Sequence, residues 1–138
     1  MGLRGWRHVP PNPKKIPDLI GGLELFAARR DLLPIGRALL VHLEFVTIHP
    51  CMDGNGRLGR LLMNHILLSA GLPWVTIRSD ERVPFFRTIE QAQVDGDAMP
   101  FIRFVWHAVQ QSATDLLDKQ RGSKPARRTR RPKPRVAK

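Results

Sequence analysis

The sequence predicts an all-α domain, and three observations support this fold class. Apolar residues recur at spacings of three and four over several segments, which is the period of a helix that buries one face. No segment sustains the alternation of apolar and polar residues typical of a half-buried strand, and no internal repeat is visible. The 138 residues have the length of one domain, which can bury a hydrophobic core without disulfides.

The first part of the chain is expected to be an irregular lead-in followed by a helix. Five glycines and prolines interrupt residues 1–16, which predicts extended or irregular backbone there. A helix is expected to begin at Pro17, where the missing N–H of proline costs nothing. A break near residues 31–34 ends it.

Four further helices are expected downstream. The helical period runs from Ile35 to Ile48, is interrupted, and resumes from Arg57, with Gly71 as the expected stop. Residues 74–77 are expected to be extended. The last two helices are predicted over residues 82–94 and 100–117.

The net charge of +11 is concentrated at the C-terminus. Residues 1–118 hold 13 basic and 12 acidic residues, whereas residues 119–138 hold ten basic residues and no acidic residue. With three prolines and few apolar side chains, residues 119–138 cannot bury enough surface to fold, so we expect a disordered basic tail. Such a tail could associate with nucleic acid in a salt-dependent way, although a purely solvating tail is the alternative that its composition favours.

Composition excludes several other classes. A single cysteine excludes an internal disulfide framework, and no apolar run approaches the ~18 residues of a membrane span. The N-terminus lacks the apolar region of a secretory signal, so we expect a cytoplasmic protein without a membrane partner. The histidines outside residues 49–60 form no metal-ligand pattern.

The segment HPCMDGNGRLGR, residues 49–60, contains the candidate functional residues. Gly54, Asn55 and Gly56 directly precede a predicted helix. Glycine and asparagine tolerate positive φ, so successive N–H groups can turn toward one anion. The positive end of the helix dipole adds to this effect. This part of the segment therefore predicts a phosphate-binding loop.

Four charged or titratable residues surround this loop. Arg57 and Arg60 lie three apart on one side of the helix, and guanidinium groups match phosphate oxygens. Asp53 is a suitable ligand for phosphate-bound Mg²⁺, and His49 is a candidate general base. Each feature alone is common in turns and on solvated helix faces. Together they indicate transfer of a phosphate-containing group from a magnesium nucleotide to a hydroxyl group.

This segment resembles the Fic-domain motif, H-P-F-x-[D/E]-G-N-G-R-x-x-R. The flanking stretches FVTIHP, RLLMNHILLSAGLP and GDAMPFIRF are also similar, so the resemblance covers about residues 8–117. It implies an all-α core with the motif between two central helices. It also implies a nucleotidyltransferase that moves AMP from ATP to a Ser, Thr or Tyr hydroxyl of a target protein (AMPylation).

The resemblance also implies roles for individual residues. His49 would deprotonate the target hydroxyl, and Asp53 would hold Mg²⁺ on the phosphates. The side chain of Asn55 would lie near the α-phosphate. The implied nucleotide-binding set is Gly54, Asn55, Gly56, Arg57, Arg60, Phe86 and Gln93. Core packing is the alternative explanation for Phe86 and its neighbour Phe85.

The sequence departs from the family pattern in three places. Cys51 replaces the usual Phe, which leaves a cavity in a family-like core. Seven residues precede His8, so residues 1–16 are expected to be a remnant of the β-hairpin flap that docks targets. None of the four glutamates has Ser or Thr four residues before it, as the family's inhibitory helix requires.

These departures leave alternatives open. The expected partners are a protein substrate, an inhibitory partner chain and a second copy of the chain in a homodimer. The first alternative function is a truncated, weak or inactive relative that binds nucleotide or a partner protein. The second is nucleic-acid association through residues 119–138.

Overall fold

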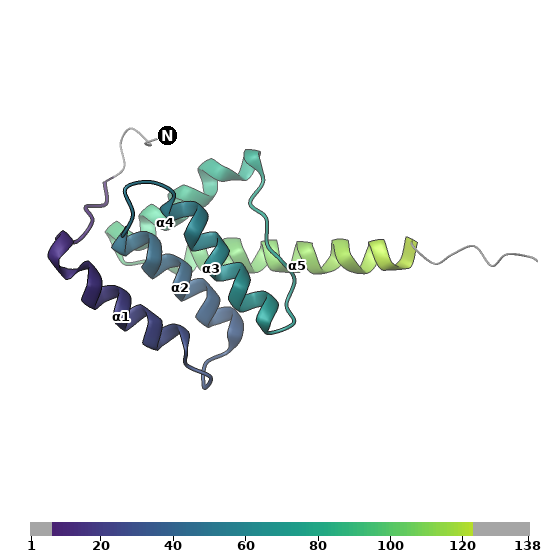
Figure 1. Cartoon of the computed structure of the whole chain (residues 1–138). Coiled ribbons are helices and arrows are strands. Elements are labelled where there is room, and N and C mark those ends of the chain that lie inside the picture. The colour runs from purple at the N-terminus through teal and green to yellow at the C-terminus, as the bar shows by residue number, and fades with distance from the viewer. Residues whose placement is uncertain (1–6, 123–138) are drawn as a thin grey trace, which may run out of the picture.

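The computed structural model describes residues 7–122, and this part of the chain is built from helices without a strand (Figure 1). The α-helices are α1 (Ile16–Ala27), α2 (Pro34–Ile48), α3 (Asn55–Ser69), α4 (Arg82–Asp95) and α5 (Met99–Gly122). Two short 3₁₀ turns, η1 (Pro13–Lys15) and η2 (Ser79–Glu81), precede α1 and α4. The predicted all-α class is confirmed, with each expected helix present.

Helix α2 lies at the centre of the domain and packs against both α1 and α3 (Figure 1). Nine of its fifteen residues are buried, so other helices cover most of its surface. Helices α4 and α5 pack against each other, and their buried aromatic residues Phe85 and Phe101 complete the core. The segment 49–54 therefore connects the two central helices, α2 and α3.

Helices α2 and α3 approach closely at Gly59. A Cβ atom at this position would lie 2.9 Å from Val46 Cγ1 and 3.3 Å from His42 Cδ2. Both distances are shorter than ordinary van der Waals contact. The absence of a side chain at Gly59 therefore sets the separation of the two helices that flank the loop.

The connection from α3 to α4 is extended and fixed to α3 by one buried amide. Gly71 has φ +74°, and the Leu72 N–H donates to Leu67 O at 2.9 Å, so the predicted stop is present. The Asn64 side chain then accepts from the Val75 N–H at 2.8 Å and donates to Val75 O at 2.9 Å. These two hydrogen bonds hold the extended segment 74–77 against α3, although it pairs with no strand in the described part of the chain.

Helix α5 is longer than the sequence predicts. It continues to Gly122, so the boundary expected at residue 119 is four residues too early. Lys119 and Arg121 lie in the last helical turn, where positive charge is favourable to the helix dipole. The second half of α5 projects beyond the other helices (Figure 1), and residues 123–138 of the expected tail lie outside the described residues. No helix of the described part is long and apolar enough to cross a membrane.

Candidate active site

The loop between α2 and α3 begins with His49 in a left-handed conformation. His49 has φ +54° and ψ +53°, and its N–H donates to Phe45 O at 3.0 Å. It is the only non-glycine residue with positive φ among residues 7–122. The left-handed turn ends α2 and directs the chain toward α3, with the His49 side chain exposed to solvent.

The side chain of Asn55 closes the loop. Its Oδ1 accepts from the Cys51 N–H at 2.9 Å, and its Nδ2 donates to Cys51 O at 2.6 Å. Asn55 is buried, so this pair of bonds is protected from water. The amide that sequence reasoning assigns to the nucleotide therefore also holds the shape of the loop. Cys51 itself is half-buried.

Helix α3 begins with an open N-terminus. Gly54 precedes it with φ +85°, and no side chain caps the first turn. Leu58 is the first residue whose N–H bonds back to the cap, donating to Gly54 O at 2.9 Å. The N–H groups of Asn55, Gly56 and Arg57 therefore lack partners within the helix and form the positive end of its dipole.

Arg57 and Arg60 lie in the first two turns of α3, and Asp53 lies in the loop just before its N-cap. Arg57 Nη2 lies 3.2 Å from Asp53 Oδ2, and both side chains are more than 70% exposed. An ion pair this exposed contributes little to stability, so a ligand can displace it at low cost. Arg60 is half-buried. Burial lowers the pKa of Arg60, and the positive charges of Arg82 and Arg57 lower it further.

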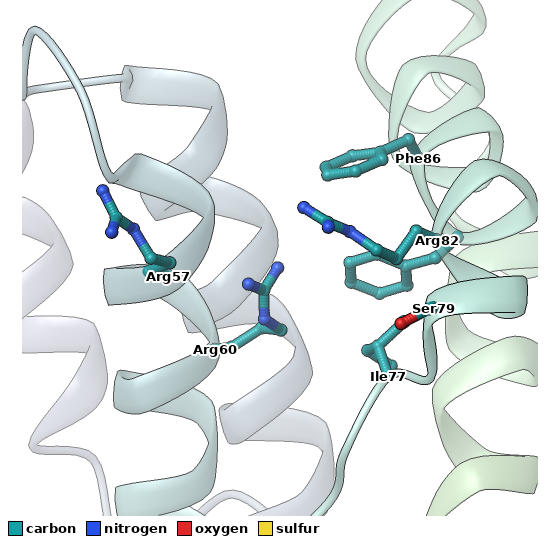
Figure 2. A pocket seen from close by; sticks show the side chains of 7 residues that line it. Arg57, Arg60, Ile77, Ser79, Arg82 and Phe86 are labelled. Atoms are coloured by element: carbon teal, nitrogen blue, oxygen red, sulfur yellow. The ribbon is translucent and has the colours of Figure 1, made fainter. Parts of the chain in front are cut away.

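Arg57 and Arg60 line a cavity of about 260 Å³ between α3 and α4. Figure 2 shows Arg60 and Arg82 directed toward each other across this cavity, whereas the Arg57 guanidinium points away from α4 and pairs with Asp53. Its walls are Arg57, Arg60, Ile77, Ser79, Arg82, Phe85 and Phe86. The cavity is smaller than the roughly 300–1,000 Å³ of pockets that enclose a drug-sized ligand, so it suits part of a nucleotide.

The other predicted nucleotide-binding residues take different positions. Both Phe85 and Phe86 line the cavity, but Phe85 is fully buried and also belongs to the core, whereas Phe86 is half-buried. Gln93 is not among the cavity residues. Its Nε2 donates to Thr47 Oγ1 at 3.1 Å, which joins α4 to the last turn of α2. The buried Oε1 of Gln93 has no hydrogen-bond partner within the described part of the chain.

Three cavity residues were not predicted from the sequence, Ile77, Ser79 and Arg82, and Arg82 is the charged one. It lies three and four residues before Phe85 and Phe86, so one face of α4 carries all three side chains. That spacing was the available signal. The position of α4 opposite Arg60 depends on how the segment before α4 is held against α3 by Asn64 and Val75, a contact that no local pattern specifies.

The donors present fit a phosphate-bound metal rather than a metal held by protein alone. No group of three or more His, Cys, Asp or Glu side chains could hold a metal among residues 7–122. Mg²⁺ at a nucleotide commonly takes one or two carboxylates and completes its shell with phosphates and water. Asp53 is exposed at the mouth of the site and can serve as such a single ligand.

Comparison with known proteins identifies relatives of this domain. Residues 2–67 match the model of the Fic/DOC family. A protein from Nematostella vectensis named "Protein adenylyltransferase Fic" is 45% identical over 101 residues, which are 71% of this chain and 23% of the relative. A protein of the same name from Drosophila grimshawi is 40% identical over 71% of this chain and 21% of its own length. The chain thus spans about a fifth of these curated relatives.

Solved structures share the fold. A Fic-domain-containing signalling protein from Bacteroides thetaiotaomicron superposes with a TM-score of 0.77 and 25% identity, covering 88% of this chain and 52% of that protein. Fic-1 from C. elegans gives a TM-score of 0.77 and 28% identity, covering 83% and 36%. Both matches extend well beyond residue 67, so the similarity includes helices that the family model does not reach.

Proposed function

Because the chain is a partial Fic/DOC-family domain, we propose that it is a protein adenylyltransferase that transfers AMP from magnesium-bound ATP to a hydroxyl group of a protein. The observation that carries this proposal is the arrangement of one loop. An exposed histidine, an uncapped helix N-terminus and two arginines lie within twelve residues, and the two arginines line one cavity. That arrangement can hold a phosphate chain next to a proton acceptor.

The proposed reaction assigns one task to each group. His49 accepts the proton of the target hydroxyl, and the hydroxyl oxygen forms a bond to the α-phosphorus. The bond from the α-phosphorus to its bridging oxygen breaks, and the electron pair leaves with pyrophosphate. The N–H groups at the start of α3 stabilise the charge that develops on the α-phosphate oxygens.

Arg57, Arg60 and Asp53 hold the rest of the nucleotide in this proposal. The two guanidinium groups bind the β- and γ-phosphates, and the exposed Asp53 carboxylate would hold Mg²⁺. When bound, Mg²⁺ neutralises phosphate charge during transfer. Arg57 exchanges its Asp53 partner for phosphate, so nucleotide binding frees the carboxylate for the metal.

The loop geometry supports an ordered site before the nucleotide binds. The two bonds between Asn55 and Cys51 fix the turn that presents the N-terminus of α3. A site fixed in advance loses less entropy on binding and during reaction. A Ser, Thr or Tyr acceptor, an inhibitory partner chain, a homodimer and a cytoplasmic location all remain predictions from the sequence.

The proposal is tested by incubating the chain with ATP labelled at the α-phosphate, Mg²⁺ and candidate protein acceptors. His49→Asn is the informative variant, because asparagine tolerates the left-handed backbone but cannot act as the base. We expect label transfer to fall by about 10²–10⁴-fold. His65→Asn, which changes an exposed histidine in α3 outside the loop, is the matched control and should transfer normally.

Two outcomes would count against the proposal. Equal labelling by the native chain and by His49→Asn would show that His49 does not move the proton. Binding of ATP without any transfer would instead favour an inactive relative that holds nucleotide.

A further inference from the structure

The cavity between α3 and α4 has three positive side chains and no carboxylate among its lining residues. Arg57 and Arg60 come from α3, and Arg82 comes from the first position of α4 (Figure 2). Arg57 is paired with Asp53, but neither Arg60 nor Arg82 forms an ion pair with an acidic residue in the described part of the chain. The cavity is therefore positively charged when empty.

The acidic residues beside Arg82 in the sequence are engaged elsewhere. Asp80 Oδ1 lies 3.4 Å from Arg78 Nε. Glu81 Oε2 accepts from the Arg78 N–H at 3.0 Å. Both carboxylates thus serve the turn that begins α4, and the exposed guanidinium of Arg82 is left without a neutralising partner.

Two features make the position of Arg82 costly without a ligand. A positive side chain at the start of a helix opposes the helix dipole. Arg82 also faces the half-buried Arg60, and its positive charge contributes to lowering the pKa of Arg60. An anion that bridges the two guanidinium groups would relieve both effects at once.

We infer that Arg82 is a third phosphate-binding residue, which closes the site from α4 and binds the leaving-group end of a nucleoside polyphosphate together with Arg60. The inference rests on the proposed function for the identity of the anion. The open N-terminus of α3 and the Arg57–Asp53 pair lie at the loop end of the site, where transfer is proposed. Arg60 and Arg82 lie along the cavity, with the Ser79 hydroxyl as a further donor.

This assignment predicts that binding depends on the number of linked phosphates in the ligand. A ligand with a single phosphate can occupy the N-terminus of α3 but cannot also reach across to Arg82. A ligand with three linked phosphates can contact both helices. Arg82 therefore favours polyphosphates over single phosphates, and it fastens α4 to α3 when the ligand is bound.

The experiment is calorimetric titration of the full chain with inorganic tripolyphosphate, without Mg²⁺ and at fixed ionic strength. We expect Arg82→Gln to raise the dissociation constant about tenfold, as the loss of one charge-assisted hydrogen bond predicts. Arg87→Gln is the matched control, since it removes the same charge from another exposed position of α4. It should change the constant less than about twofold, as expected for a charge that makes no direct contact. Arg82→Lys should give an intermediate constant, because it keeps the charge but loses the planar fork.

Equal constants for Arg82→Gln and Arg87→Gln would overturn the inference, and so would a native chain that does not bind tripolyphosphate. Unchanged melting temperatures of the variants show that the fold is intact. Transfer of label from ATP is measured separately. Transfer without an Arg82 effect leaves only the proposed function standing, whereas Arg82-dependent binding without transfer leaves only this inference standing.

Discussion

His42 is a neutral histidine inside the core, next to Gly59 of α3. It is fully buried, stacks on Phe101 with ring centroids 5.4 Å apart, and lies 5.6 Å from the ring of Phe85. Neither ring nitrogen has a hydrogen-bond partner among the described residues. Burial, with a smaller contribution from the positive charge of Arg60, lowers the pKa of His42 to about 3. His42 therefore behaves as an aromatic packing residue at neutral pH.

This pKa predicts that acid destabilises the fold through one residue. Below pH 6.5 the unfolded chain gains a proton at His42 that the folded chain does not accept until about pH 3. The free energy of unfolding should fall by about 1.4 kcal/mol for each pH unit across this window. Urea unfolding between pH 7 and pH 4 measures the slope. In His42→Leu, which keeps the packing volume, that contribution should be absent, and equal slopes for both chains would contradict the assignment.

Helices α2 and α3 position the site because they touch without an intervening side chain. Their contact at Gly59 lies between Gly56, in the uncapped first turn of α3, and the body of that helix. Val46 and His42, on the other side of the contact, belong to the most buried helix of the domain. Packing at one glycine therefore determines where the uncapped end of α3 points.

Gly59→Ala should consequently destabilise the domain although alanine is the better helix former. The added Cβ meets Val46 Cγ1 at 2.9 Å, and overpacking of this kind costs about 1–3 kcal/mol. Gly22→Ala is the matched control, because a Cβ there in α1 meets nothing within 4 Å. It should stabilise by about 0.4–1 kcal/mol. Thermal unfolding distinguishes the two, and a stable Gly59→Ala would mean that the helices can separate.

At the scale of the whole molecule, basic residues are concentrated in two separate groups. The cavity between α3 and α4 concentrates three arginines within the part of the chain that the structure describes. Residues 123–138 contribute eight further basic residues and no acidic residue. The large net charge of the chain is thus mostly independent of the proposed active site, and the two can be tested apart.

Nucleic-acid association, the alternative to a purely solvating tail, predicts salt-dependent retention on duplex DNA. Eight cations that contact phosphates would lower affinity by about 10³–10⁵-fold between 50 and 200 mM salt. A chain that ends at Gly122 should lose most of this retention while keeping its helical signal. Filter retention across salt concentrations measures the difference. If both chains are retained equally, nucleic-acid association does not depend on residues 123–138.

The central part of the fold could be predicted from the sequence because its signals are local. The helical period before and after residues 49–60 places the loop, and Gly71 marks the end of α3. Residue positions that depend on contacts between distant parts of the sequence could not be predicted. Gln93 pairs with Thr47, 46 residues away, and Arg82 reaches the site only because Asn64 holds the extended segment on α3. No pattern within a few residues encodes either contact.

At position 49, the residue that the proposed reaction needs is not the residue that stabilises the fold most. A non-glycine residue in the left-handed conformation of His49 costs about 1 kcal/mol, and glycine would adopt it freely. Glycine has no side chain that can accept a proton, however. Glycine at position 49 would therefore suit the turn best but would abolish the proposed reaction. Selection of variants for thermal stability alone should therefore tolerate or even favour His49→Gly. The selected protein would be folded but would not transfer AMP.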